Sequence, residues 1–409
     1  MGKTERYKAP TKPHFCRAIL TAALLLTLSA CNLSGSTSPV DSNRPGEQAP
    51  NLTPTQQGHS AQEASGISHN MGQGSQTASA TPATPVTSGI LMPDNPHAEE
   101  AMQAISDQGV PMATESEGGQ PLPFRLEDNV KVFELTAKPI RWPILKANGR
   151  DVAADVIATA YSYNGQVPGP LIRVTEGDKV RVVFTNQLPE PTTIHWHGIS
   201  VPNQMDGVPD LTQQAIQPGQ SFTYEFVARP AGTFWYHSHF RSDVQIGVGL
   251  HGAIIIDPQT ETEPKPDVDR VLMLNEWRIV DGKTYASMPA TGMDANYFTI
   301  NGKAFPDTEV INVKQGQRVR LRLIGAGQLG HPMHIHGPAF QIIATDGHPV
   351  PEAARLTKDT VWVSPGERYD IEWVASQPGR WLLHCHISHH TTNDHQEPGG
   401  LMLILNVQP

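Results

Sequence analysis

Two stretches in the first half of the chain return in the second half with the same spacing. Residues 169–186 resemble residues 307–327, and residues 216–239 resemble residues 363–386. In all four stretches one glycine stands 18 residues before a histidine. Similarity at fixed spacing is the signature of a duplicated structural unit. The chain is therefore predicted to contain two copies of one domain.

Each copy is made of short runs rich in Val, Ile, Phe, Tyr and Trp, bounded by Gly and Pro. The chain has 35 glycines and 36 prolines but only 17% charged residues, which favours short strands and turns over long helices. We predict an all-β protein with two β-sandwich domains, at 124–260 and 265–409, joined near residues 260–269. One large irregular β-domain is the alternative, and the duplication disfavours it.

The first 31 residues are typical of an export signal. Basic residues precede an apolar run, Ala18–Ala30, that is too short to span a bilayer. The run ends in Leu-Ser-Ala-Cys31, which resembles a bacterial lipobox, the signal for attaching lipid to the cysteine. An ordinary cleaved signal is the alternative. We expect an exported, extracytoplasmic protein, in the periplasm or at the cell surface, with a lipid anchor at Cys31 to the bacterial outer membrane or cell surface.

Residues 32–123 contain no Phe, Trp or Tyr and are dominated by Ser, Thr, Pro, Gln, Gly and Ala. Such a segment cannot bury enough apolar surface to offset the entropy of ordering it, so we predict a disordered, flexible linker. The net charge of −10 argues against a surface that binds phosphate groups. We therefore expect no nucleic acid partner.

Four His-x-His motifs occupy duplicated positions. Residues i and i+2 of a strand face the same side, so each motif presents two imidazoles to one point. A single such motif is usually a surface feature, but four at repeated positions indicate a metal site. Eight imidazoles exceed the needs of one ion, and all-nitrogen ligation suits copper or zinc. The motifs are His195 and His197, His237 and His239, His334 and His336, and His384 and His386.

The residue between His384 and His386 is a cysteine, Cys385, whose side chain should point to the opposite face of the strand. It can reach His390, five residues later, and His331, three residues before the third motif. Two histidines and a thiolate are the trigonal set of a blue copper site. Zinc would accept these ligands. A single peptide that joins the cysteine to two cluster ligands makes sense only for electron transfer.

The stretches HWHG, HSH, HPMHIHG and HCHISHH resemble the four copper motifs of the multicopper oxidase family, in family order, over residues 124–409. That family includes laccases, bilirubin oxidases and cuprous oxidases. The resemblance implies cupredoxin-like Greek-key sandwiches and four coppers per active site. It assigns the type 1 copper to His331, Cys385 and His390, and the type 2 copper to His195 and His334. It assigns the type 3 pair to His197, His237, His239, His336, His384 and His386.

The same resemblance implies a reaction. The type 1 copper takes single electrons from a small reducing substrate. Cys385, His384 and His386 pass them to the cluster, where dioxygen is reduced to two waters. The MDGVP stretch matches an acidic residue near the family's cluster, so Asp206 is a candidate proton relay. The alternative is that Asp206 only forms an Asp-Gly turn.

The chain departs from the family in having two domains where most laccase-like oxidases have three. In the resembling two-domain oxidases, three subunits form a ring, and domain 1 of one subunit meets domain 2 of the next at the cluster. We therefore expect a homotrimer. The positions in domain 1 that match His331, Cys385 and His390 hold Thr192, Ser238 and Asp243, so only domain 2 should bind a type 1 copper.

A second departure follows His390, where TTNDHQEPGG looks like a six-residue insertion. Leu401 then holds the position of the family's axial residue, and Met402, the stronger ligand, comes next. We favour Leu401 as a non-coordinating axial neighbour of the type 1 copper. The remaining histidines have no partner at a repeated position and are treated as non-ligands. They are His14, His59, His69, His97, His251, His348, His389 and His395.

These observations favour a copper-dependent oxidoreductase with oxygen as acceptor, a laccase-like enzyme acting on phenolic or similar donors. A metal-ion oxidase for Cu(I), Mn(II) or Fe(II) is the first alternative, although methionine-rich insertions are absent. Copper nitrite reductase is a further alternative, but it has its blue site in domain 1 and lacks the His-Cys-His relay, so the sequence argues against it. A non-enzymatic copper-binding protein has no need of a cysteine connected to two histidines.

Overall fold

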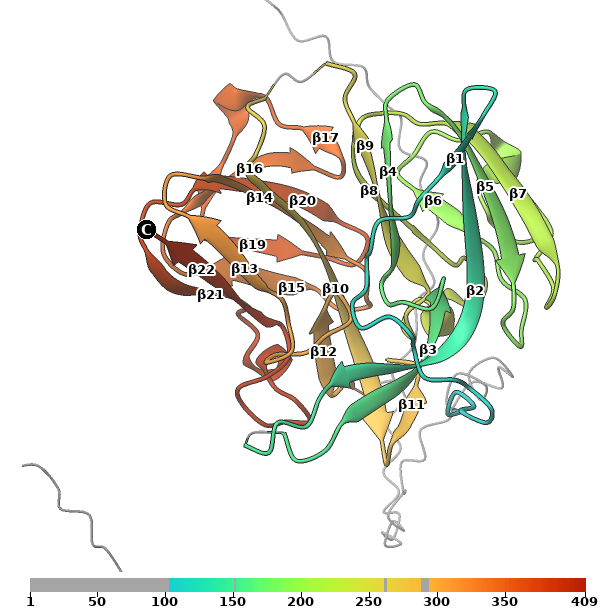
Figure 1. The fold of residues 1–409 in the computed structure, drawn as a ribbon, viewed down its shortest axis with the longest axis horizontal. Helices are drawn as coiled ribbons and strands as arrows, with labels where there is room; N and C mark the ends of the chain where they lie inside the picture. The colour runs from blue at the N-terminus through green and yellow to red at the C-terminus, as the bar shows by residue number, and fades with distance from the viewer. Residues whose placement is uncertain (1–102, 151, 261–262, 288–293) are drawn as a thin grey trace, which may run out of the picture. The chain divides into compact units, whose positions relative to one another are not determined.

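The computed structural model describes residues 103–150, 152–260, 263–287 and 294–409 (Figure 1). The signal region, Cys31 and residues 32–102 of the expected linker lie outside the described residues. Within the described ranges, no helix is long and apolar enough to cross a membrane.

Domain 1 packs two β-sheets face to face (Figure 1). One sheet has the order β1-β2-β5-β7, with β3 beside β2, and the other has the order β4-β9-β8-β6. The elements are β1 (Arg125–Glu127), β2 (Val130–Leu145), β3 (Val156–Tyr163), β4 (Gly169–Thr175), β5 (Lys179–Asn186), β6 (His195–His197), the 3-10 turn η1 (Asn203–Met205), β7 (Ser221–Val227), β8 (Gly232–His237), the helical turn α2 (Ser242–Gln245) and β9 (His251–Asp257).

Domain 2 repeats this plan. Its sheets have the orders β11-β10-β14-β20-β16-β17, with β12 beside β10 and β18 beside β16, and β13-β22-β21-β15-β19. The elements are β10 (Val268–Val280), β11 (Lys283–Tyr285), β12 (Tyr297–Ile300), β13 (Val310–Lys314), β14 (Arg318–Gly325), β15 (His331–Ile335), β16 (Phe340–Thr345), β17 (His348–Pro349), η2 (Glu352–Ala354), β18 (Thr357–Lys358), β19 (Thr360–Val363), β20 (Arg368–Val374), β21 (Gly379–Cys385), η3 (Ser388–Thr391) and β22 (Met402–Gln408).

The strands form where apolar and polar residues alternate. Along β5 and β22 every second residue is buried, which places one face of each strand in the core. The order β4-β9-β8-β6 in domain 1 corresponds to β13-β22-β21-β15 in domain 2, and both begin with a parallel pair. The structure thus confirms the predicted all-β fold and the duplication.

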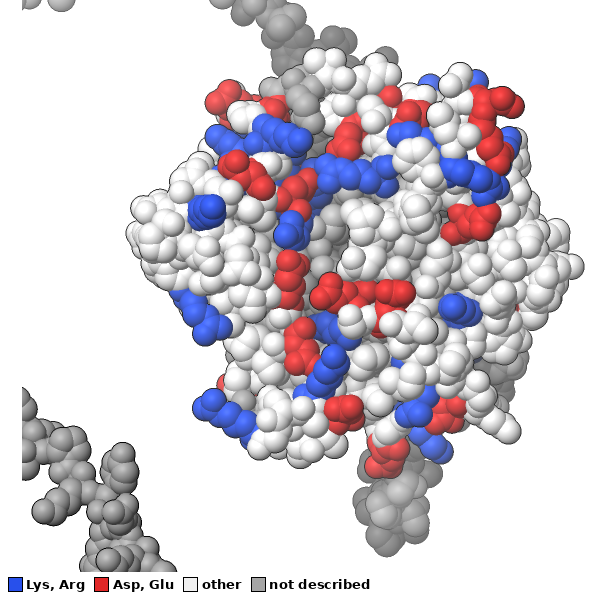
Figure 2. All heavy atoms as spheres, viewed as in Figure 1, with Lys and Arg blue, Asp and Glu red and all other residues white. Residues whose placement is uncertain are grey.

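The two sandwiches meet at a buried polar network. Thr233 of β8 donates a hydrogen bond to Asp370 of β20 at 2.7 Å. Arg322 of β14 pairs with Asp370 at 3.0 Å and with Asp269 of β10 at 2.7 Å. Figure 2 shows charged side chains of both signs close together along this boundary, with broad uncharged areas on either side. Because the charges are paired, the network fixes how the sandwiches pack.

Residues 103–123 differ from the expected flexible linker, because they pack against domain 1. The backbone N–H of Ala113 donates to the carbonyl of Arg141 at 3.0 Å, and that of Leu122 donates to the carbonyl of Leu171 at 2.8 Å. Backbone hydrogen bonds of this kind need no aromatic side chains. The composition of the segment therefore could not reveal its attachment.

Candidate metal centres

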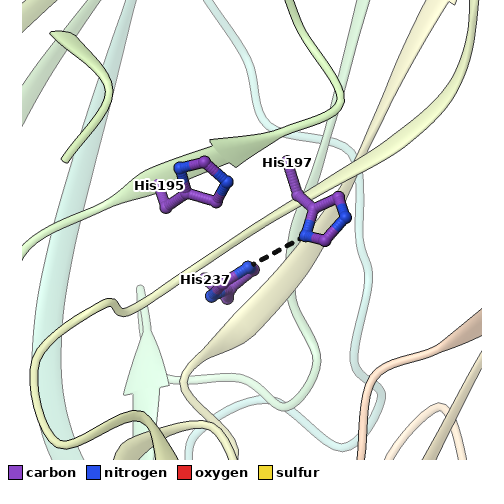
Figure 3. Close-up of side chains that lie close together, drawn as sticks. All are labelled: His195, His197 and His237. Carbon is purple, nitrogen blue, oxygen red and sulfur yellow. Dashed lines mark hydrogen bonds between the residues drawn. The ribbon is translucent and has the colours of Figure 1, made fainter. Parts of the chain in front are cut away.

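The first group of histidines lies on β6 and β8 of domain 1. His195 stands directly opposite His237 in the antiparallel ladder, and Figure 3 shows both rings beside that of His197. The possible ligand atoms of these three residues all lie within 4.8 Å of one another. His197 Nδ1 is 3.3 Å from His237 Nε2. The ring of His239 lies 5.5 Å from that of His195, so the four histidines of the two His-x-His motifs in domain 1 gather in one place.

Backbone carbonyls orient these imidazoles. His195 Nδ1 donates to the carbonyl of Asp206 at 2.8 Å, and His237 Nδ1 donates to the carbonyl of Ser238 at 2.8 Å. This leaves Nε2 of each ring free to bind a metal ion. Burial lowers the pKa of His197 to about 4, helped by the charge of Arg368. Burial also puts the pKa of His237 well below its usual value, so both rings are neutral at neutral pH.

The second group repeats this arrangement in domain 2. His334 stands opposite His384 in the β15–β21 ladder, as His195 stands opposite His237. His336 Nε2 lies 3.1 Å from His384 Nε2, and the ring of His386 lies 5.4 Å from that of His334. His384 Nδ1 donates to the carbonyl of Cys385 at 2.9 Å. In domain 1 the carbonyl of the residue after His237, Ser238, orients the His237 ring in the same way.

The two groups remain separate within one chain. In the described part of the chain, no histidine ring of domain 1 contacts a histidine ring of domain 2. Each possible three-residue metal site likewise takes its residues from one domain. His239, His336 and His386 are exposed. Each group is therefore an open cluster of imidazoles at the surface of its domain. We call it a half-site, because the family resemblance implies that the two groups together hold one copper cluster.

A third site lies in the core of domain 2. His331, Cys385 and His390 are all buried, and their ligand atoms lie within 4.8 Å of one another. Cys385 Sγ is 4.0 Å from His331 Nδ1 and 3.5 Å from His390 Nδ1. A thiol and two imidazoles in an apolar core suit copper, and the three ligand atoms leave room to converge on one ion.

The β-ladder distinguishes the two candidates for the axial position. Met402 pairs with His384, so its side chain lies on the face of the sheet opposite to Cys385. The N–H of Cys385 donates to the carbonyl of Leu401, and the Leu401 side chain is fully buried in the core that contains Cys385. This arrangement places Leu401, rather than Met402, on the side of the cysteine.

Domain 1 has a hydrogen-bonded network at the position corresponding to the third site. Thr192 and Ser238 donate to Gln245 Oε1 at 2.8 and 2.5 Å, and all three residues are fully buried. The repeat in the sequence matches Asp243 to His390, but Asp243 is exposed at the start of α2. The helical turn brings Gln245 to this position instead. No thiol or imidazole is present among these residues.

Comparison with known proteins agrees with this geometry. The family model described as multicopper oxidase matches residues 148–261 and 280–396, together more than half of the chain. The chain belongs to the multicopper oxidase family. Its two sandwiches are accordingly cupredoxin-like domains, as the sequence predicted.

Individual relatives give the extent of the similarity. Copper resistance protein A of Pseudomonas syringae pv. tomato is 40% identical over 263 residues, which cover 52% of this chain and 42% of that protein. The blue copper oxidase from Nitrosomonas europaea is 41% identical, with a TM-score of 0.59 over 68% of this chain and 85% of that chain. The multicopper oxidase mgLAC is 37% identical, with a TM-score of 0.62 over 68% and 86%. The chain spans half or less of the length of the first curated relatives it matches.

Two residues beside the third site of this multicopper oxidase were not predicted from the motifs. Glu276 of β10 is fully buried next to His331, and the ring of Phe298 of β12 stacks on that of His390 at 4.4 Å. The one signal for Glu276 is an acid inside the apolar run VLMLNEW. His389 lies beside His390 in the 3-10 turn η3.

The ionisation of the third site predicts how it takes up metal. Burial raises the pKa of the Cys385 thiol to about 11 and lowers that of His390 to about 3. A metal ion must therefore displace a proton from the thiol but none from His390. We expect Co(II) binding to release one proton, with an affinity that rises about tenfold per pH unit near neutrality. Calorimetry in buffers of different ionisation enthalpy measures this proton, and Cys385→Ser should release none. A wild-type count near zero would contradict the assignment.

Proposed function

We propose that the protein is a laccase-like oxidase that couples one-electron oxidation of a small phenolic or similar donor to the four-electron reduction of dioxygen to water. The observation that carries this proposal is the placement of Cys385 in a buried site while its neighbour His384 belongs to a half-site on the other face of the same sheet. Copper bound at these sites would supply reversible one-electron transfer at one and dioxygen reduction at the other. Membership of the multicopper oxidase family supports the proposal.

The chain's own residues have distinct parts in this function. His331, Cys385 and His390 would hold one type 1 copper in an apolar core that excludes water, beside the buried side chain of Leu401. Two connections join Cys385 to His384, namely the peptide bond and the hydrogen bond from His384 Nδ1 to the Cys385 carbonyl. Electrons can follow either connection from the buried site to the half-site.

Asp206 suits the delivery of protons. Its Oδ1 lies 3.5 Å from His195 Nδ1, and its side chain is 35% exposed. A carboxylate that contacts both solvent and the edge of a half-site can carry protons to it. The turn that holds Asp206 requires a glycine at 207, where φ is 84° and a Cβ would overlap the carbonyl of Ile194.

We further propose that three subunits form a ring in which domain 1 of one subunit meets domain 2 of the next. Each contact completes one cluster of a type 2 copper and a type 3 pair from two half-sites. The separation of the half-sites within one chain and the exposure of His239, His336 and His386 support this assembly. The lipobox at Cys31 supports export and a lipid anchor.

Replacing Cys385 by Ser tests the electron route. The variant should lose the blue absorbance and turnover, because serine does not provide the thiolate of the buried site. It should keep three coppers per active site, because the half-sites are intact. Metal analysis, visible spectra and oxygen uptake with a phenolic donor measure these effects. Persistent turnover would refute the route through Cys385.

A mixing experiment tests the assembly. His237→Ala disables the half-site of domain 1, and His336→Ala disables that of domain 2, so each variant alone should be inactive. Coexpressed subunits should regain about one quarter of wild-type turnover, because random rings contain contacts between two intact half-sites. Light scattering should show a trimer. A fully copper-loaded, active monomer, or coexpressed subunits with no activity, would contradict the ring.

One observation favours a second candidate function, the oxidation of Cu(I). The rings of His389 and His395 stack at 5.2 Å, within the 4.9–6.4 Å found between rings of the candidate copper ligands. His389 Nε2 donates to the carbonyl of Ala295, which leaves Nδ1 free. The ring of His389 lies 6.1 Å from that of His390. A cuprous ion between His389 and His395 would thus be close to the buried site.

His395→Ala distinguishes the two kinds of donor. The KM for Cu(I) should rise about tenfold because one imidazole is lost, while oxidation of a phenol stays unchanged. Oxygen uptake with each donor measures this, and His348→Ala, at another exposed histidine, is the matched control. An unchanged KM for Cu(I) in His395→Ala would exclude this site.

A further inference from the structure

Two buried polar atoms beside the type 1 site face each other without any hydrogen-bond partner. They are Oε2 of Glu276 and Nε2 of His331, which lie 3.7 Å apart. Both side chains are fully buried. Buried polar atoms normally have a partner, and an unpaired carboxyl oxygen in an apolar core requires an explanation.

The chemistry of His331 supplies that explanation. Its Nδ1 faces Cys385 Sγ and His390 Nδ1, so Nδ1 is the nitrogen that binds a metal ion. A neutral imidazole that binds metal through Nδ1 carries its proton on Nε2. That N–H points toward Glu276. When the site holds a metal ion, His331 Nε2–H is therefore the hydrogen-bond donor that Glu276 Oε2 lacks.

We propose that Glu276 is a positioning residue that accepts a hydrogen bond from His331 Nε2–H and lowers the reduction potential of the type 1 copper. This proposal rests on the assignment of that copper to His331, Cys385 and His390. A carboxylate that holds a metal-bound histidine fixes the orientation of the ring and increases its basicity. Negative charge beside the site also favours the oxidised ion over the reduced one.

The fold is built to keep the carboxyl in place. The backbone N–H of Gln328 donates to Glu276 Oε1, so one oxygen is fixed and the other faces His331. Residue 327 is a glycine, and a Cβ there would overlap both carboxyl oxygens. Any residue larger than glycine at position 327 would therefore clash with the Glu276 carboxyl group.

The strand partner of Glu276 supports the other imidazole. Glu276 pairs directly with Phe298 in the β10–β12 ladder. The ring of Phe298 stacks on that of His390 at an interplanar angle of 24°. One cross-strand pair thus contacts both histidines of the site, and neither of its members was found by the metal-binding motifs.

The reduction potential of the copper tests the proposal. Redox titration followed at the blue absorption band should show a higher potential in Glu276→Gln, which keeps the size of the side chain and removes the charge. We expect the equilibrium constant for reduction to rise at least tenfold, which corresponds to about 59 mV for a one-electron couple. Glu276→Asp should lie closer to the wild type. Glu372→Gln is the matched control, because Glu372 is also buried in domain 2 but pairs with Arg318 and Arg320.

A second variant perturbs the contact from the other side. Gly327→Ala should displace the carboxyl and raise the potential while Glu276 stays in the chain, so it tests the proposal even if Glu276→Gln fails to fold. An intact blue band with wild-type potential in both variants would overturn the proposal and leave the proposed function standing. Absence of a blue band in the copper-loaded wild type would instead refute the assignment of the type 1 site, and with it the proposed function.

Discussion

The alternation of side chains along strand β21 determines how the sites are arranged. Because successive residues of a strand face opposite sides, Cys385 enters the core of domain 2 while His384 faces outward. The neighbouring strand β15 alternates in the same way, with His331 inward and His334 outward. The buried site and the open site therefore lie on opposite faces of one sheet. A shift of one residue in this ladder would reverse both faces and destroy both sites.

Burial and backbone hydrogen bonds prepare the histidines before any metal binds. Desolvation keeps imidazoles such as His237 and His390 neutral, and a neutral ring has a lone pair to offer. Carbonyls of neighbouring residues accept the Nδ1 protons of His195, His237 and His384, which directs Nε2 of each ring outward.

The sequence was informative where chemistry follows from spacing along the chain. The repeat predicted two sandwiches, and the His-x-His motifs predicted which histidines gather. Contacts between residues far apart in the chain could not be predicted from the sequence. Glu276 and His331 are 55 residues apart and meet only because β10 packs beside the loop that precedes β15. The match of Asp243 to His390 was wrong in space because the helical turn α2 brings Gln245 forward. The packing of residues 103–123 depends on backbone hydrogen bonds, which composition does not encode.

The open half-sites have a thermodynamic consequence. Each is held on strands of a rigid sandwich, so in the proposed ring a complete cluster would form by docking two finished surfaces rather than by closing a loop. In such a ring, metal binding and subunit association are linked functions. Whatever factor a neighbouring subunit adds to the affinity for copper, copper adds the same factor to the affinity between subunits. Removing copper with a chelator would then weaken the association between subunits, and diluting the protein would weaken its binding of copper. The copper supply would set the fraction of the protein that is assembled.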